Sequence, residues 1–134
     1  MADTVTSQTI QDGEKLAIVK FTNESDGTGE SSVKKVDVSA LSKDSRGRSC
    51  SSVSISRIYW ACRGMGVDIE FDATTNVLAI PLPADSTGDE YYDLFTGIPN
   101  NAGSGVTGDI DFTTVGHSNG DAYSIILVLT KNYS

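Results

Sequence analysis

The stretch CSSVSISRIYWACRGMGVDIEFD (residues 50–72) combines a dense run of β-branched and aromatic residues with one short glycine-bearing turn. Its second half places Val67, Ile69 and Phe71 at alternate positions with acidic residues between them, as in a strand with one buried and one wet face. Its first half changes parity near Arg57, which indicates a β-bulge there or a strand end covered on both faces. We therefore predict a central β-hairpin.

Within this stretch Trp60, the only tryptophan, is expected to anchor the core. The pattern of the remaining chain predicts further strands separated by turns. The last two strands are expected to form a second hairpin across Asn119-Gly120, a strong hairpin-turn dipeptide. The strands outside the central hairpin are predicted at residues 4–11, 15–23, 31–41, 77–84, 109–116 and 122–133, with loops at 42–49, 85–90 and 97–108. About eight strands without a convincing helix predict an all-β, single-domain antiparallel β-sandwich or jelly roll.

The first strand differs from the others because it is polar on both faces, which suits an extended arm or an edge strand. We predict an N-terminal arm at residues 1–12 and a β-sandwich domain at residues 13–134. The arm is expected to pair with a neighbouring subunit, and the domain to fold without residues 2–12. The long, uncharged loop at 97–108 is expected to be functional or mobile and to become ordered on a partner.

The charge balance limits the choice of partners. The chain has 134 residues, which fits one domain. Its net charge of −8 opposes binding to the phosphate backbone of a nucleic acid. We therefore expect no nucleic-acid partner. The basic residues are concentrated in one third of the chain, where they are either solvated loop residues or a surface for an acidic partner. They are Lys34, Lys35, Lys43, Arg46, Arg48, Arg57 and Arg63.

No apolar run approaches the length of a membrane span, and residues 1–15 have neither a basic start nor an apolar stretch. We expect no membrane association, no secretory signal and synthesis in a cytoplasm. Cys50 and Cys62 are then expected to be reduced thiols. On one extended strand they would be about 40 Å apart, far beyond the roughly 7 Å that a disulfide spans between Cα atoms.

The sequence gives little support for catalysis. His117, the only histidine, shares one turn with Ser118 and Asp121, but triads are usually assembled from separate elements. One histidine and two cysteines without a CxxC motif cannot complete a four-ligand zinc site. We therefore predict that the protein is not an enzyme, with no catalytic residues and no cofactor.

Two acidic runs and a set of aromatic residues leave alternatives open. Two of the residues Asp68, Glu70 and Asp72 could form the carboxylate pair of a glycosidase, or all three could bind calcium. Asp109 with Asp111 could also bind calcium. Neither run has the spaced oxygen-ligand loop of a calcium site, and a solvated sheet face explains the first one, so we predict no metal site. Aromatic residues that could line a sugar-binding platform are Tyr59, Trp60, Tyr91 and Tyr92.

Taken together, residues 21–41, 57–74 and 99–131 resemble a type of small virion structural protein of tailed bacteriophages, particularly those of marine bacteria. The resemblance covers most of the chain but carries no active-site motif. It implies a virion component made in the host bacterial cytoplasm, most simply a decoration (cement) protein bound to the major capsid protein on the capsid surface. It also implies a homotrimer. A tail, neck or baseplate component is the alternative within the virion, and a carbohydrate-binding module the alternative outside it.

Overall fold

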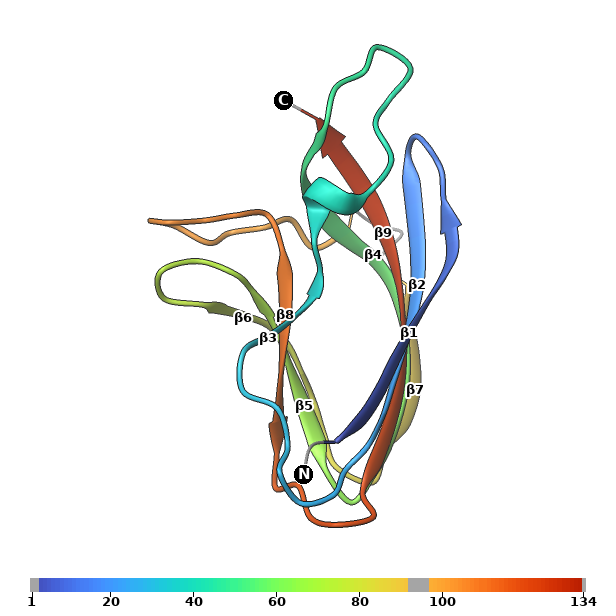
Figure 1. Ribbon diagram of the computed structural model, residues 1–134, viewed down its shortest axis with the longest axis vertical. Coiled ribbons are helices and arrows are strands. Elements are labelled where there is room, and N and C mark those ends of the chain that lie inside the picture. The colour runs from blue at the N-terminus through green and yellow to red at the C-terminus, as the bar shows by residue number, and fades with distance from the viewer. Residues whose placement is uncertain (1–2, 92–96, 134) are drawn as a thin grey trace.

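The computed structural model describes residues 3–91 and 97–133. Within these residues the chain forms nine strands and one 3-10 helix, η1 (Figure 1). They are β1 (Thr4–Asp12), β2 (Leu16–Glu24), β3 (Val33–Val36), η1 (Val38–Ala40), β4 (Cys50–Arg63), β5 (Gly66–Phe71), β6 (Val77–Leu82), β7 (Thr87–Tyr91), β8 (Ile110–Val115) and β9 (Ala122–Tyr133).

The strands form two antiparallel sheets that face each other as the two layers of a sandwich (Figure 1). Sheet A has the order β1-β2-β9-β4-β7, and sheet B has the order β3-β8-β5-β6. The predicted all-β sandwich is confirmed. The additional strand is β7, which lies where the sequence predicts a loop at residues 85–90, and it pairs with β4 at the margin of sheet A.

The predicted central hairpin is wrong, because its two arms belong to different sheets. Strand β4 pairs with β7 and β9, whereas β5 pairs with β6 and β8. The turn at Gly64 and Met65 therefore carries the chain across the end of the sandwich (Figure 1). Met65 is fully buried in this crossing. Gly66, the first residue of β5, lies so close to β6 that an added Cβ would be 2.7 Å from the carbonyl oxygen of Leu82.

The predicted second hairpin is wrong for the same reason. Strand β8 lies in sheet B and β9 lies in sheet A, so the turn containing Asn119-Gly120 also crosses between the layers. In both cases the two strands bury their apolar faces in the same core from opposite sides. A pair of amphipathic strands can satisfy this requirement face to face as well as edge to edge.

Of the two explanations for the parity change near Arg57, the structure confirms the β-bulge in β4. Ile55 pairs with Leu129 and the next pair is Arg57 with Val128, so Ser56 is an extra residue. The bulge allows Ile55 and Ile58, which differ in parity, to be buried on the same side of the sheet. The alternation predicted for β5 is also confirmed, since its apolar residues Val67, Ile69 and Phe71 are fully buried.

The core between the sheets is centred on aromatic and branched side chains. Phe112 contacts Phe21 and Tyr123 edge to face, with ring centroids 5.3 and 5.8 Å apart. Trp60, which the sequence predicts as the anchor of the core, packs against the core only at its margin. Its indole is only partly buried, beside the marginal strand β7, where its Nε1 donates to the Oγ of Ser86 at 3.0 Å.

The stretch predicted to be an arm or an edge strand is the edge strand β1. It pairs along its length with β2 in the same chain, and nearly all of its residues are exposed. Its two ends are fixed by carboxylates. Asp3 accepts hydrogen bonds from the backbone N–H of Asp26 and Gly29, and Asp12 forms an ion pair with Lys131.

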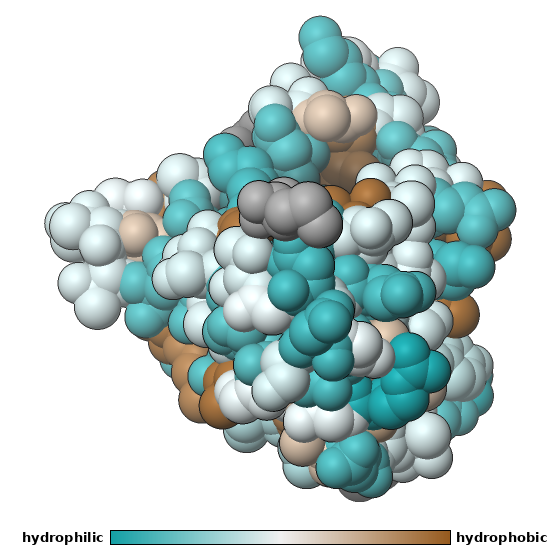
Figure 2. All heavy atoms as spheres, turned by 60° about the horizontal axis from the view of Figure 1, so that its bottom comes forward, coloured by the Kyte–Doolittle hydropathy of each residue, from teal (hydrophilic) through white to brown (hydrophobic). Residues whose placement is uncertain are grey.

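Two uncharged loops, residues 73–76 and 97–108, extend together from one end of sheet B, and we call them the projection. They are joined by a hydrogen bond from the Thr74 N–H to the Ser104 carbonyl at 3.1 Å. Figure 2 shows the projection at the left, mostly pale because few of its residues are strongly hydrophilic or hydrophobic. The longer loop is anchored near its start by a two-way backbone pairing of Ile98 with Ile55.

Candidate functional site

The outer face of sheet A carries apolar side chains at its centre. In the register of the strands, Tyr59 on β4 lies beside Ile126 on β9, and Arg57 lies beside Val128, which in turn lies beside Ile18 on β2. All five side chains are partly exposed, because they point away from the core. We call these five residues the sheet A patch. The final strand β9 is therefore apolar on both faces and, as predicted, central in its sheet.

Arg57 organises the margin of this patch. Its Nε and Nη2 donate to the two carboxylate oxygens of Asp89 at 3.1 and 2.9 Å. Its guanidinium also lies 4.7 Å from the ring centroid of Tyr59 and 5.2 Å from that of Tyr91. The hydrogen bond with Asp89 raises the pKa of Arg57 and lowers the pKa of Asp89. These contacts favour one arrangement of the side chains before any partner binds.

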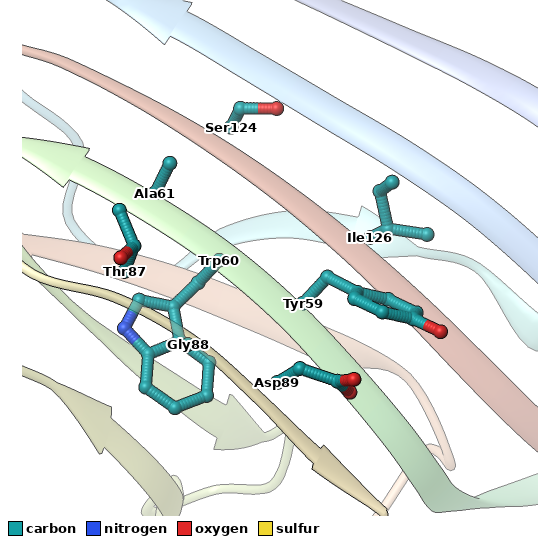
Figure 3. Close-up of a pocket in the computed structure, with 8 residues that line it drawn as sticks. All are labelled: Tyr59, Trp60, Ala61, Thr87, Gly88, Asp89, Ser124 and Ile126. Atoms are coloured by element: carbon teal, nitrogen blue, oxygen red, sulfur yellow. The ribbon is translucent and has the colours of Figure 1, made fainter.

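A shallow hollow of about 470 Å³ lies next to the patch (Figure 3). Figure 3 shows the Trp60 indole over Gly88 of β7, and an added Cβ at Gly88 would lie 2.4 Å from that ring. Glycine at this position therefore lets the indole cover the β7 backbone. The hollow is lined by Tyr59, Trp60, Ala61, Thr87, Gly88, Asp89, Ser124 and Ile126.

The structure brings together only some of the aromatic residues that the sequence suggests for a sugar-binding platform. Tyr59 and Tyr91 flank Arg57, and Tyr91 is 59% exposed. Trp60 has the same parity as the buried residues Ile58 and Cys62. Its side chain therefore turns toward the inner side of sheet A, away from Tyr59 and Tyr91. Tyr92 lies outside the described residues.

The clustered basic residues do not form one basic surface, since most of them pair with the chain's own acidic groups. Four ion pairs join Lys34 to Asp109, Lys35 to Glu30, Arg48 to Asp44 and Arg57 to Asp89. Arg63 donates to the carbonyl of Gly120 instead. These contacts favour an intramolecular role for most of the cluster over a docking surface for an acidic partner.

The outer face of sheet B joins the two acidic runs that the sequence keeps apart. Glu70 on β5 is the register partner of Asp111 on β8, and Asp72 also contacts Asp111. Burial and the nearby charge of Glu70 raise the pKa of Asp68. Among the described residues, no group of three or more histidine, cysteine or acidic side chains has a geometry that could hold a metal ion.

The three polar residues of the last turn do not converge. The Nδ1 of His117 is 3.1 Å from the Oγ1 of Thr114, and its ring packs against Gly29. The carboxylate of Asp121 accepts the backbone N–H of Ser118 at 2.9 Å. In the part of the chain that the structure describes, no hydrogen bond connects the imidazole with Ser118 or Asp121. The arrangement stabilises a turn and lacks the nucleophile–base contact of a triad.

Comparison with protein-family models and with curated proteins finds no match for this chain. Within residues 3–91 and 97–133, no helix has the length and apolar character needed to cross a membrane.

Proposed function

We propose that this chain is a bacteriophage virion structural protein, a capsid decoration protein that binds the outer surface of the major capsid protein shell as a homotrimer and has no catalytic role. The sequence resemblance suggests the virion, and the sheet A patch is the observation that carries the proposal. Aromatic residues and arginine are enriched in the centres of protein interfaces, where charged residues such as lysine, glutamate and aspartate are depleted.

The patch has the features that a docking surface for a rigid shell requires. Ile126, Val128 and Tyr59 stand on adjacent central strands, so their positions are set by the sheet rather than by a loop. The two hydrogen bonds to Asp89 already restrict Arg57, which reduces the side-chain entropy lost on binding. Elsewhere the chain is acidic, with 18 Asp and Glu against 10 Lys and Arg, which favours solubility before assembly.

Binding of purified variants to phage heads that lack the protein tests this proposal. Ile126→Thr keeps a β-branched residue but removes apolar contact area, and it is expected to weaken binding about tenfold. Leu78→Thr is the matched control, because Leu78 is 50% exposed on β6 of the other sheet. Equal binding of both variants and the wild type would contradict the docking surface. Cryo-electron microscopy density for this chain on the tail, neck or baseplate would instead support that alternative.

A carbohydrate-binding module is the second candidate, because Tyr91 is largely exposed and contacts Arg57, which is hydrogen-bonded to Asp89 of the hollow. Aromatic faces and charged hydrogen-bonding groups together are suited to a sugar ring. Glycan-array binding that is lost with Tyr91→Ala, while binding to phage heads is unchanged, would favour this candidate over capsid decoration.

A further inference from the structure

A buried carboxylate, that of Asp111, lies at the base of the projection. Asp111 is 2% exposed, and its Oδ2 accepts a hydrogen bond from the Nδ2 of Asn76 at 2.9 Å. No donor among the described residues reaches its other oxygen, Oδ1. A buried acceptor without a donor is unfavourable, and a buried charge without a partner is more so.

The charged groups around Asp111 do not supply the missing partner. Glu70 faces it from β5, Asp72 contacts it from the residue after β5, and Asp109 lies two residues before it, just ahead of β8. Lys34 is its register neighbour on β3, but the ammonium forms its ion pair with Asp109 at 3.0 Å. Asp111 is therefore surrounded mainly by other carboxylates, and ionisation of both members of the Asp72–Asp111 pair is opposed by like-charge repulsion.

A proton fits this position better than a metal ion. A calcium ion takes six to eight oxygen ligands, often from several carboxylates, whereas the described residues contain no group of three candidate metal-binding side chains with suitable geometry. A single proton needs only two carboxyl groups in contact, which is the arrangement of Asp72 and Asp111.

We propose that Asp72 and Asp111 share one proton, and that this proton fastens the projection to the outer face of sheet B. Each carboxyl group holds one loop of the projection. The Oγ1 of Thr107 donates to Asp72 at 2.7 Å, and the Nδ2 of Asn76 donates to Asp111. When the proton is lost, two carboxylates repel each other between these anchors, and both loops loosen. This inference does not depend on the proposed function.

The titration of the pair sets the pH range. Burial, followed by contact with Asp72, raises the pKa of Asp111 from its ordinary 3.8 to about 6. Hydrogen bonds from Thr107 and Asp111 lower the pKa of Asp72. Because the folded-state pKa of Asp111 is raised, the stabilisation from its proton is fully present below the unfolded value near pH 4 and is lost as the pH rises through about 6.

Hydrogen–deuterium exchange of residues 97–108 at about pH 5 and about pH 7.5, corrected for intrinsic exchange rates, tests the inference. Protection in the wild type is expected to be about 10- to 100-fold lower at the higher pH. Asp111→Asn is expected to remove this dependence, since an amide supplies a permanent donor. Asp68→Asn, on the same sheet face, is the control and is expected to keep it. Equal wild-type protection at both pH values, or loss of the pH dependence in both variants, would overturn the inference.

Two further measurements keep the test decisive. Carboxyl carbon NMR of the wild type should show one aspartate titrating near pH 6, even if Asp111→Asn does not fold, whereas titration of every aspartate below about pH 5 would overturn the inference. Calcium chloride alone should not restore protection of residues 97–108 at the higher pH. Restoration by calcium would show that a cation, not a proton, belongs between Asp72 and Asp111.

Discussion

Replacing Asp12 with asparagine is expected to destabilise the fold strongly, because Asp12 is the carboxylate that pairs with a fully buried lysine. The side chain of Lys131 is 0% exposed and that of Asp12 is 25% exposed. The remaining contacts of the Lys131 ammonium are the carbonyl and hydroxyl oxygens of Ser42, at 3.1 and 3.0 Å. Asp12→Asn would leave a buried positive charge facing neutral groups only.

Removing one partner of a buried ion pair typically lowers the free energy of unfolding by about 3–5 kcal/mol. Because Asp12 is partly exposed, we expect a smaller loss of about 2–3 kcal/mol here. With a urea m-value of about 2 kcal/mol/M, the unfolding midpoint should fall by about 1–1.5 M. Asp89→Asn is the matched control, because it breaks an ion pair that is exposed on both sides and should cause a smaller loss. Midpoints that fall equally in the two variants would refute the reasoning.

The acid dependence of this pair follows from its pKa. Burial acts to raise the pKa of Asp12, but hydrogen bonds from Lys131 and Ser42 outweigh it, and the net effect lowers the pKa. The stabilisation is therefore present above the unfolded value of about 3.9 and is lost as the pH falls through the lower folded value. The same contact argues against the expectation that the domain folds without residues 2–12, since that deletion removes Asp12.

The remaining predictions concern close packing and the two thiols. Gly66→Ala should lower the free energy of unfolding by about 1–3 kcal/mol in urea titrations, because its Cβ would press on the Leu82 carbonyl, whereas Gly103→Ala meets open space and should be neutral. A neutral Gly66→Ala would contradict the described crossing. Burial raises the pKa of Cys50 and Cys62, so a thiol reagent should modify them only after unfolding. Fast reaction of the native protein would show that β4 opens.

The sequence predicts local features of this fold well. The parity change near Arg57 predicts the bulge, because the side chains of a strand must keep one face toward the core. Pro81 and Pro83 have no amide hydrogen to donate, so they predict either an edge strand or a strand end, and β6 does lie at the edge of sheet B. Both inferences use constraints that act within a few residues.

The pairing of strands could not be predicted in the same way. Gly64 and Asn119-Gly120 favour tight turns, but a tight turn can join strands within one sheet or across two sheets. The choice depends on which distant strands compete for the same edge, and here β9 occupies the side of β4 that β5 would otherwise take. Strand β7 was missed because its residues, TGDEY, have little β-propensity and gain their order from pairing with β4.

The residues of both candidate sites are brought together by the order of the strands in the sheets, which the sequence alone does not reveal. Ile126 and Tyr59 are far apart in sequence, and only the register of β4 and β9 makes them neighbours. The acidic runs around Glu70 and Asp111 likewise meet only through the pairing of β5 and β8. The sequence identifies the residue types, but their convergence requires the sheet order.

The central place of β9 in sheet A also affects when this protein can fold during synthesis. Leu16 pairs with Thr130 and Cys50 pairs with Tyr133, so β2 and β4 lack their shared neighbour until β9 has left the ribosome. Before that moment all strands of sheet B can pair, but sheet A consists of two separate pairs, β1 with β2 and β4 with β7, with no strand to join them. Nonlocal strand pairing of this kind is slow, and exposed strands invite association between chains. Chaperone protection of nascent chains should therefore affect the yield of this protein more than the stability of its finished fold.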